Sequence, residues 1–253
     1  MIAVAGGKGG SGKTTTTLGL ARAVARRGRS DGVVAVDADW DLPNLERLAT
    51  ATGDEPDRER APTVIDAIRS ADSVRSKHVD DSARSKHADA SLAPLDADPT
   101  VLAAPDDPVA HDACEVLSAL ACRLDSAART VLVDCPAGAS PDAAAPLRAA
   151  DHTVLVTPLR PAALRDTVKT AAMARALDCP PLGVVATRTG SAPDRLSELL
   201  DCPVLGSIPE ATPAPLSDRE VRSAYDEVVH ALSSISGRER STYRQSQRRT
   251  DNR

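Results

Sequence analysis

The chain has 253 residues, of which 42% are hydrophobic, and its formal net charge at pH 7 is −5. This length allows one large α/β domain with a sizeable core. No apolar run approaches the length of a transmembrane helix, and the first strand-like run follows Met1 directly, which leaves no room for a secretory signal peptide. We therefore expect a cytoplasmic protein without a transmembrane segment.

The residue types limit the fold and the chemistry further. Aromatic residues make up 1% of the chain and Phe is absent, so the core must consist of Val, Leu, Ile and Ala. These residues are typical of parallel strands that are buried on both faces. The cysteines are odd in number and include no C-x-x-C pair, which argues against a disulfide framework and against a dedicated zinc or iron–sulfur site. They are Cys114, Cys122, Cys135, Cys179 and Cys202.

The glycine-rich segment at residues 7–14 carries the strongest functional signal. It has the phosphate-loop pattern of a Gly, four residues and Gly-Lys-Thr, and it lies between the strand-like residues 2–5 and a helix-like run. Glycines let backbone N–H groups surround phosphate oxygens, and the new helix directs its positive end at the same anion. A chance glycine-rich turn is the alternative, but strand, loop and helix arrive in the required order. The expected nucleotide contacts are Gly7, Gly9, Gly10, Ser11, Gly12, Lys13, Thr14 and Thr15, with Lys13 on the β- and γ-phosphates and the Thr14 hydroxyl on Mg²⁺.

Two later strand-like runs end in carboxylates. Residues 33–36 lead into Asp37 and Asp39, and residues 130–134 end in Asp134, which is followed by Cys-Pro-Ala-Gly. The carboxyl ends of parallel strands border the crevice in which α/β sheets bind ligands. We expect Asp134 to hold Mg²⁺, as the corresponding Asp does in phosphate-loop enzymes. For the Asp37 segment an acidic surface turn is the alternative, because Pro43 and Asn44 favour turns.

A second lysine, Lys8, lies near the start of the loop, and residues 8–14 thereby resemble the deviant phosphate loop of the MinD/ParA family of ATPases. The resemblance implies that Lys8 reaches across a homodimer to phosphates held by the partner subunit. From the residues alone, a solvated loop lysine remains the alternative. The resemblance also implies that Asp39 orients the attacking water near the γ-phosphate and that Asp37 supports the magnesium shell.

The same resemblance extends over most of residues 1–235. It implies that the Gly138 backbone N–H contacts the γ-phosphate, that Thr187 and Arg188 lie beside the adenine, and that Pro209 lies near the base. Cys135 lies within the matching motif, but no histidine near it in sequence supplies the base that a nucleophilic cysteine needs. We interpret Cys135 as a residue without a chemical role.

Further strand-like runs at residues 152–156, 182–186 and 204–208 alternate with helical patterns, which implies parallel pairing and right-handed crossovers. The expected fold is a three-layer, doubly wound α/β domain over residues 1–235, of the P-loop NTPase type. Residues 51–98 are polar, and residues 72–80 are nearly repeated at 81–89, so we expect a partly disordered insertion at about 70–98. His78 and His87 in this repeat suggest either metal capture or, as we favour, a solvated surface segment. A helix is expected to begin near Thr63.

Residues 236–253 are expected to form a basic, disordered tail. Residues 238–253 carry a net charge of +4, which leaves −9 for the rest of the chain. The tail has no apolar stripe, so we see no amphipathic membrane-targeting helix. Electrostatic contact with nucleic acid or with an anionic membrane, and a merely solvated end, remain open. The acidic residues are mostly Asp and the basic residues are mostly Arg, a bias that suggests either a GC-rich genome or a salt-adapted cytoplasm.

The resemblance implies an ATP-binding, slowly ATP-hydrolysing switch that uses ATP/ADP and Mg²⁺, forms an ATP-dependent homodimer and acts with an unidentified protein partner or activator. Such a switch would help to position a division site, a chromosome or plasmid, or a polar assembly, and it would be cytoplasmic or peripheral at membrane or nucleoid. One alternative is a nucleotide-gated scaffold with little turnover. Another is a relative of iron–sulfur-carrier ATPases, against which the missing C-x-x-C pair counts.

Overall fold

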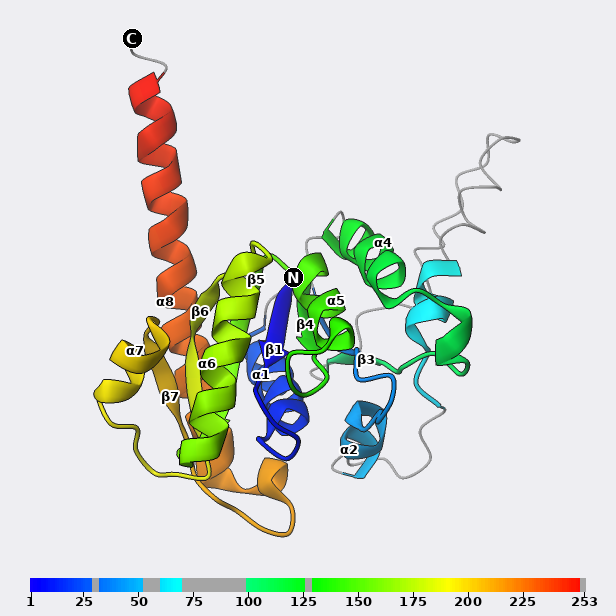
Figure 1. The fold of residues 1–253 in the computed structure, drawn as a ribbon, viewed down its shortest axis with the longest axis horizontal. Coiled ribbons are helices and arrows are strands. Elements are labelled where there is room, and N and C mark those ends of the chain that lie inside the picture. Colours follow the sequence, from blue (N-terminus) through cyan, green and yellow to red (C-terminus); the bar gives the residue numbers. More distant parts are fainter. Residues whose placement is uncertain (29–31, 52–59, 70–98, 126–128, 251–253) are drawn as a thin grey trace.

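The computed structural model describes residues 1–28, 32–51, 60–69, 99–125 and 129–250, and for residues 236–250 it describes the backbone. Within these residues one parallel sheet has the strand order β3-β2-β4-β1-β5-β6-β7 (Figure 1). The strands are β1 (Ile2–Ala5), β2 (Val33–Asp37), β3 (Thr100–Leu102), β4 (Thr130–Asp134), β5 (His152–Pro158), β6 (Pro181–Thr187) and β7 (Val204–Ile208). The predicted doubly wound, parallel fold is confirmed.

Helices cover both faces of this sheet. They are α1 (Lys13–Arg26), α2 (Leu45–Ala51), α4 (Ala113–Asp125), α5 (Pro141–Ala149), α6 (Pro161–Ala176), α7 (Arg195–Leu200) and α8 (Arg219–Thr250), with a further helical turn over residues 64–69. Helices α1, α2 and α8 pack on one face, and residues 64–69, α4, α5, α6 and α7 pack on the other. The expected helix near Thr63 is therefore present.

The pattern of β2 shows why the strands read as continuous apolar runs. Successive side chains of a strand point to opposite faces of the sheet. Val33 and Ala35 accordingly pack in the core beneath α1, whereas Val34 and Val36 pack beneath α4. Because both faces are covered, all four residues are at most 5% exposed. Alternation of polar and apolar residues is thus absent, as in other buried parallel strands.

The order of the strands places the ligand crevice at the end of β1. From β1 the chain moves to β2, β3 and then back to β4 on one side, and afterwards continues through β5, β6 and β7 on the other. Open α/β sheets bind ligands outside the carboxyl ends of the strands at such a switch point. The glycine-rich loop that follows β1 lies at this point, and the carboxyl ends of β2 and β4 lie beside it.

Close packing joins α8 to α1. A Cβ built on Gly19 would lie 2.4 Å from Cε2 of Tyr225, so the tyrosine ring occupies the space that any larger residue at position 19 would fill. Tyr225 is 1% exposed, and its hydroxyl lies 3.4 Å from the hydroxyl of Thr16. Burial raises the pKa of Tyr225 to about 12. Through Tyr225, the first turns of α8 are held next to the first half of α1.

The structure differs from our expectation at the C-terminal end. Helix α8 continues to Thr250, whereas we expected a disordered tail from residue 236 (Figure 1). The preceding turns of α8 are already packed against the domain, so the helix is nucleated before it reaches this segment. Residues 238–250 contain no Pro or Gly, which would disfavour its continuation. The expected insertion at about 70–98, with His78 and His87, lies outside the described residues.

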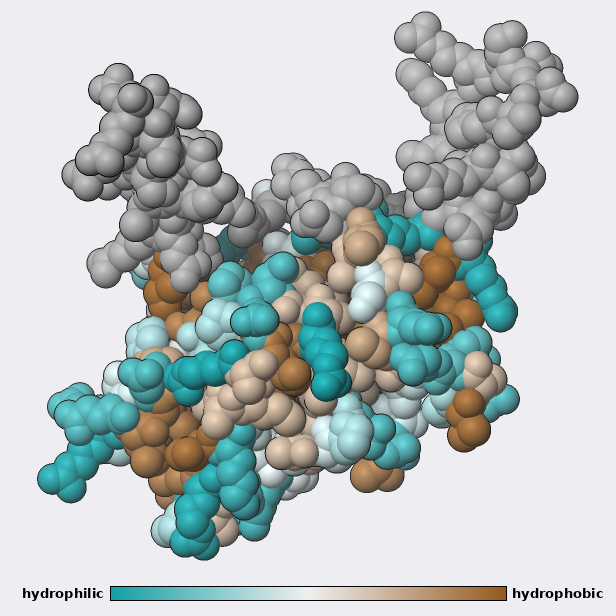
Figure 2. Space-filling model, turned by 45° about the horizontal axis from the view of Figure 1, so that its top comes forward, coloured by the Kyte–Doolittle hydropathy of each residue, from teal (hydrophilic) through white to brown (hydrophobic). Residues whose placement is uncertain are grey.

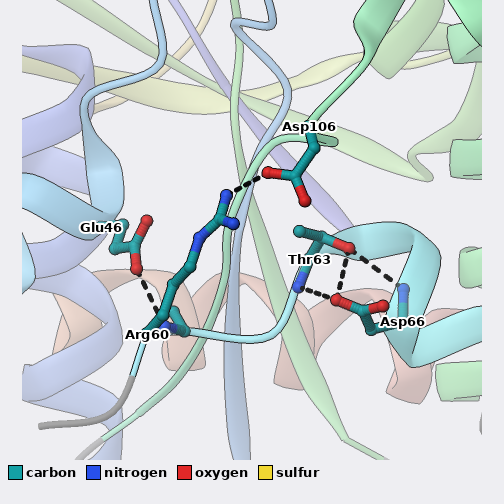
Figure 3. Close-up of polar contacts among 6 residues, drawn as sticks. Glu46, Arg60, Thr63, Asp66 and Asp106 are labelled. Atoms are coloured by element: carbon teal, nitrogen blue, oxygen red, sulfur yellow. Dashed lines mark hydrogen bonds and ion pairs between the residues drawn. The ribbon is translucent and has the colours of Figure 1, made fainter.

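Polar contacts hold residues 60–66 in place next to α2 and the loop that follows β3 (Figure 3). The guanidinium of Arg60 pairs with the carboxylate of Asp106. The backbone N–H of Ala61 donates to Oε1 of Glu46 on α2 at 2.8 Å. Thr63 and Asp66 exchange side-chain and backbone bonds of 3.0 and 3.1 Å, which begins the helical turn at residues 64–69. These bonds lower the pKa of Asp66. The contacts connect α2 to the loop that follows β3.

The amino-end edge of the sheet is tilted toward the viewer in Figure 2, where hydrophilic side chains are interspersed with small hydrophobic patches. The large apolar side chains that are exposed among the described residues are Leu42, Val109, Val168 and Leu199, and they lie in different parts of the chain. Of the helices in the described part of the chain, none combines the length and the apolar character that crossing a bilayer requires.

Candidate nucleotide-binding site

The glycine-rich loop connects β1 to α1 through backbone conformations that favour glycine. Gly10 and Gly12 have φ angles of 71° and 93°, in the left-handed region. Gly7 is needed for a different reason, because a Cβ on it would lie 2.3 Å from the backbone of Asp166 in α6. The loop is therefore closely packed against α6, and the first turn of α1 opens directly from it.

Lys13, the first residue of α1, lies inside this loop. The residue is only 7% exposed, and its ammonium group donates to the carbonyl oxygen of Lys8 at 3.4 Å. A buried ammonium group normally has a charged or strongly accepting partner. Among the described residues this long bond to the loop itself is the one hydrogen bond of the Lys13 ammonium group, so the geometry suits the arrival of an anion such as a phosphate.

Two carboxylates lie side by side at the carboxyl ends of β2 and β4. Asp37 and Asp134 are register partners on the adjacent strands, and each is 1% exposed. Burial raises the pKa of Asp134 to about 7, although the hydroxyl of Thr14 and the charge of Lys13 act in the opposite direction. Burial likewise raises the pKa of Asp37 to about 6. Ionising these two buried carboxyl groups therefore costs free energy, and a cation bound next to them would offset that cost.

Thr17 was not among the residues that the sequence pointed to, yet it contacts Asp134. Its hydroxyl lies 3.0 Å from the carbonyl oxygen of Lys13 and 3.4 Å from Oδ1 of Asp134, and the residue is fully buried. The signal available in the sequence was its position one turn after Lys13, which places it on the same face of α1.

Asp37 organises the segment that follows β2. Its Oδ1 accepts the backbone N–H of Asp39 at 3.1 Å, and its Oδ2 accepts those of Asn44 and Leu45, both at 3.0 Å. These three bonds oppose the effect of burial on its pKa. The carboxylate therefore fixes the turn over residues 38–45 and the start of α2, and it positions Asp39. The direct structural role of Asp37 is in this turn.

The other residues of the turn point to different partners. Asp39 is half-buried, and its Oδ1 accepts the N–H of Leu42 at 3.3 Å. The indole N–H of Trp40 donates to the carbonyl oxygen of Asp37 at 3.2 Å. Asp39 and Trp40 thus belong to one compact turn at the carboxyl end of β2, next to the glycine-rich loop.

After β4, the chain passes beside the same loop. Gly138 has a φ of 95°, and its N–H faces the carbonyl oxygen of Gly6 at 3.5 Å. This long bond leaves the N–H close to the loop. Cys135 is 1% exposed, and burial raises the pKa of its thiol well above the usual range. A protonated, buried thiol agrees with our interpretation that Cys135 has no chemical role.

A cavity of about 360 Å³ opens next to the loop, and it collects the residues expected near a nucleobase. Gly12, Thr15, Thr187, Arg188 and Pro209 all line it. The hydroxyl of Thr187 donates to the carbonyl oxygen of Ser11 at 2.8 Å, which connects the end of β6 to the loop. The volume of the cavity lies in the range of small-molecule sites.

Residues that sequence analysis missed complete the cavity. Tyr225 on α8 lines it, and so do residues 211–213 and Pro215 in the segment after β7. Tyr225 lies 209 positions after Thr16, with which it makes contact, so only the fold brings the two together.

The scan against family models decides the relationship. Residues 2–220 match the model described as the CobQ/CobB/MinD/ParA nucleotide binding domain. The chain belongs to this family. Members are ATP-binding P-loop NTPases.

Known proteins resemble the chain over different lengths. The septum site-determining protein MinD of Synechocystis is 54% identical over 48 residues, which is 19% of this chain and 17% of that protein. An uncharacterised ATP-binding protein of Methanocaldococcus jannaschii is 28% identical over 193 residues, 75% of this chain and 65% of that protein. Both matches thus span less than two thirds of the curated relatives. The structure of MinD from Pyrococcus horikoshii in complex with Mg-ADP has a TM-score of 0.69 and 24% identity, covering 93% of this chain and 96% of that one.

The family's early lysine, Lys8, is engaged within its own chain. Its ammonium group lies 3.5 Å from Oδ2 of Asp166 on α6, and Lys169 pairs with Oδ1 of the same carboxylate at 3.2 Å. Mainly through the bond from Lys169, these contacts lower the pKa of Asp166. The Lys8 side chain is 51% exposed, so it is held by an exposed ion pair rather than buried.

The donor set in this MinD/ParA-type domain fits Mg²⁺ together with a nucleotide. The hydroxyl of Thr14 and the carboxylate of Asp134 are hard oxygen donors on adjacent elements. In the described part of the chain no group of three or more His, Cys, Asp or Glu side chains is placed to hold a metal ion. Phosphate oxygens and water would therefore have to complete the coordination, which is the usual arrangement for Mg²⁺ in phosphate-loop proteins.

Proposed function

We propose that this chain is an ATP-dependent switch that binds Mg-ATP, dimerises with it and hydrolyses it slowly. The observation that carries the proposal is the convergence around one loop of a buried lysine, a buried carboxylate pair and a base-sized cavity. Family membership supports ATP as the nucleotide. The relative from Pyrococcus horikoshii was solved with Mg-ADP, which supports the same class of ligand here.

Binding would use groups that are already positioned. The phosphates would enter the loop in front of α1, where backbone N–H groups and the positive end of the helix meet them. Lys13 would exchange its long bond to the Lys8 carbonyl for the β- and γ-phosphate oxygens. The base would occupy the cavity lined by Thr187, Arg188 and Tyr225.

Hydrolysis would depend on residues from the two segments that follow β2 and β4. Asp39 would orient the attacking water, and Asp37 holds the turn that carries it. The N–H of Gly138 would exchange its long bond to Gly6 for a γ-phosphate oxygen. Thr14 and Asp134 would hold Mg²⁺, which neutralises charge on the phosphates when bound. The ammonium group of Lys8 would leave Asp166 and add its positive charge to the phosphates that the partner subunit holds.

The binding test can use the single tryptophan of the chain, because Trp40 lies in the turn next to the loop. We expect Mg-ATP to change its fluorescence in the wild type and in a Lys169→Ala control, and to have no effect in Lys13→Ala. Calorimetry without any heat from Mg-ATP on folded wild-type protein would contradict the proposal.

The dimer test uses Asp39→Ala, which should retain Mg-ATP binding and accumulate as a dimer on gel filtration. The variant leaves the buried loop residues untouched, because Asp39 is only half-buried. If this variant stays monomeric with ATP, the switch model is wrong.

The cellular role that we propose is the positioning of a division site, a chromosome or plasmid, or a polar assembly, together with an unidentified protein partner. We propose a cytoplasmic protein that attaches reversibly to membrane or nucleoid. The basic C-terminal end of α8 is the candidate contact for nucleic acid or an anionic membrane. A fluorescently tagged wild type should form foci or polar caps that the Lys13→Ala variant lacks, and identical distributions would argue against nucleotide control.

A scaffold with little turnover is the second candidate. It is favoured by the contacts of Lys8 with Asp166 and of Asp39 with Leu42, which hold two of the expected catalytic groups within the free chain. Phosphate release by the wild type that is no faster than by Lys13→Ala would favour the scaffold. The iron–sulfur alternative is not proposed, because the five cysteines are free and include no C-x-x-C pair.

A further inference from the structure

The turn over residues 38–45 ends in a short helix that the rest of the domain must hold in place. Asp37 bonds this turn from the side of the sheet, and its Oδ2 accepts the N–H groups of Asn44 and Leu45 where α2 begins. Helix α2 has seven residues, and Leu45 is the one that is fully buried. A helix of two turns is not stable by itself in water, so its orientation depends on contacts with neighbouring segments.

Glu46, in the first turn of α2, makes such a contact with a segment that follows it by 15 positions. Its Oε1 accepts the backbone N–H of Ala61 at 2.8 Å (Figure 3). This length is typical of a charge-assisted hydrogen bond. Glu46 is half-buried, so water and salt screen the bond less than they would at a fully exposed site. The bond therefore connects α2 firmly to the backbone at Ala61.

This partner segment is itself fixed to the edge of the sheet. The carbonyl oxygen of Pro62 accepts the N–H of Ala103, and the N–H of Val64 donates to the carbonyl oxygen of Ala103, both at 2.9 Å. The two bonds add a parallel bridge at the edge of the sheet next to β3. Val64 is fully buried in the core between the sheet and α4, and Arg60 pairs with Asp106. The segment is thus a rigid support for α2.

We propose that Glu46 is a positioning residue for ATP hydrolysis. Its bond to Ala61 fixes α2, and α2 in turn fixes the turn that carries Asp39. This inference rests on the proposed function, because it connects the placement of Asp39 with the rate of hydrolysis. Within the described chain Glu46 is not among the residues that line the base-sized cavity, so it acts through the turn and not on the nucleotide.

Loss of the bond should slow the reaction and leave nucleotide binding intact. A catalytic group that is misplaced by about 1 Å can lower a rate by about a hundredfold. The glycine-rich loop and Lys13 make their contacts elsewhere, so they remain as they are when α2 shifts. The expected effect of removing Glu46 is therefore on kcat and not on KM.

A simpler role of Glu46 has to be separated from this one. An acidic side chain in the first turn of a helix stabilises the helix through its dipole, whatever the side chain bonds to. Glu46→Gln loses the charge but keeps an oxygen that can accept the N–H of Ala61, whereas Glu46→Ala loses both. Glu115→Ala is the matched control, because Glu115 is an exposed acidic residue in the first turn of α4.

The kinetic test measures ATP hydrolysis by the full chain with Mg²⁺. We expect Glu46→Ala to lower kcat about tenfold and to change KM by less than about twofold. Glu46→Gln should keep kcat within about threefold of the wild type, since it keeps the acceptor, and Glu115→Ala should match the wild type. A role in the helix dipole alone would instead make Glu46→Gln as slow as Glu46→Ala.

The donor side of the bond supplies an independent variant. Ala61→Pro removes the N–H and leaves the carboxylate of Glu46 in place. It should lower kcat about as much as Glu46→Ala does. The double variant should be no slower than either single variant, because the same bond is lost in all three. Melting curves establish that each variant is folded.

Measurements without nucleotide separate this inference from the proposed function. Trp40 lies within the turn and is the single tryptophan of the chain. In the free protein, Glu46→Ala should make Trp40 more accessible to quenching by acrylamide and should speed hydrogen exchange over residues 38–45, whereas Glu46→Gln and Glu115→Ala should not. If the wild type does not hydrolyse ATP, the proposed function fails, while quenching and exchange still decide whether Glu46 holds the turn.

Unchanged quenching and exchange in Glu46→Ala would overturn the inference, even in a protein that hydrolyses ATP. Equal kcat values for Glu46→Ala and Glu115→Ala would also overturn it, because the bond to Ala61 would then have no bearing on the reaction.

Discussion

Replacing Thr17 by Val tests whether the buried face of α1 sets the metal affinity of the site. Valine keeps the shape of threonine and removes only the hydroxyl, which lies 3.0 Å from the Lys13 carbonyl and 3.4 Å from Oδ1 of Asp134. A hydrogen bond to a charged group contributes about 1.5–3 kcal/mol, and the length of this one places it at the lower end or below, at about 1 kcal/mol. Such a loss corresponds to a decrease of roughly fivefold in the affinity of the ADP-bound protein for Mg²⁺.

The assay is a titration of Mg²⁺ at fixed ADP, followed through the fluorescence of Trp40. Thr17→Ser restores the hydroxyl and should recover most of the affinity. Thr167→Val is the matched control, because it removes an equally buried hydroxyl that bonds only the Ala163 carbonyl of α6, at 2.8 Å. The reasoning fails if Thr17→Val binds Mg²⁺ as tightly as the wild type, or if Thr17→Ser is as weak as Thr17→Val.

Four further predictions follow from the packing, the carboxylates and the composition. Gly19→Ala should destabilise the protein by about 1–3 kcal/mol through overlap with the Tyr225 ring, measured by urea unfolding, and a neutral effect would contradict the close packing of α1 and α8. Because the pKa values of Asp37 and Asp134 are raised to about 6 and about 7, these groups stay protonated in the folded state while they ionise in the unfolded state; their contribution to stability is therefore full below about pH 4 and is lost as the pH rises to about 7. Protonation of the same carboxylates competes with Mg²⁺, so Mg²⁺ affinity should fall as the pH drops below about 7, and a flat profile between pH 5 and 8 would count against this. If the acidic excess reflects a salt-adapted cytoplasm, the melting temperature should rise between about 0.2 and 2 M KCl, and an unchanged value would remove that explanation.

The parts of the site that sequence analysis identified share a local cause. The loop at residues 7–14 and the segments after residues 36 and 133 each combine an apolar strand with the residue types that phosphate or metal chemistry needs. Their pattern is complete within about ten residues, so no knowledge of packing is required. Accordingly, Lys13, Asp37, Asp134 and Gly138 lie around one loop in the structure.

The missed parts depend on contacts between distant segments or on short elements. Strand β3 has three residues, which are too few to show a pattern in the sequence. It forms because its backbone pairs in parallel with the free edge of β2. Tyr225 looked like one apolar position of a helix, and only the packing of α8 on Gly19 places it at the cavity. Asp166 is likewise one charge on an amphipathic helix until the loop brings Lys8 next to it. At the C-terminal end the composition carries no helical signal, whereas growth of α8 beyond residue 235 depends on the turns that are already formed.

The bonding of Asp37 makes an isosteric replacement at this position anything but conservative. Both of its oxygens act as acceptors, one for a single N–H and the other for two. An asparagine can present its oxygen on one side only, so its NH₂ group would confront at least one backbone donor with a second donor. Loss of activity in Asp37→Asn would thus include the disruption of a folded turn, so it would not by itself measure the part that Asp37 takes in the magnesium shell.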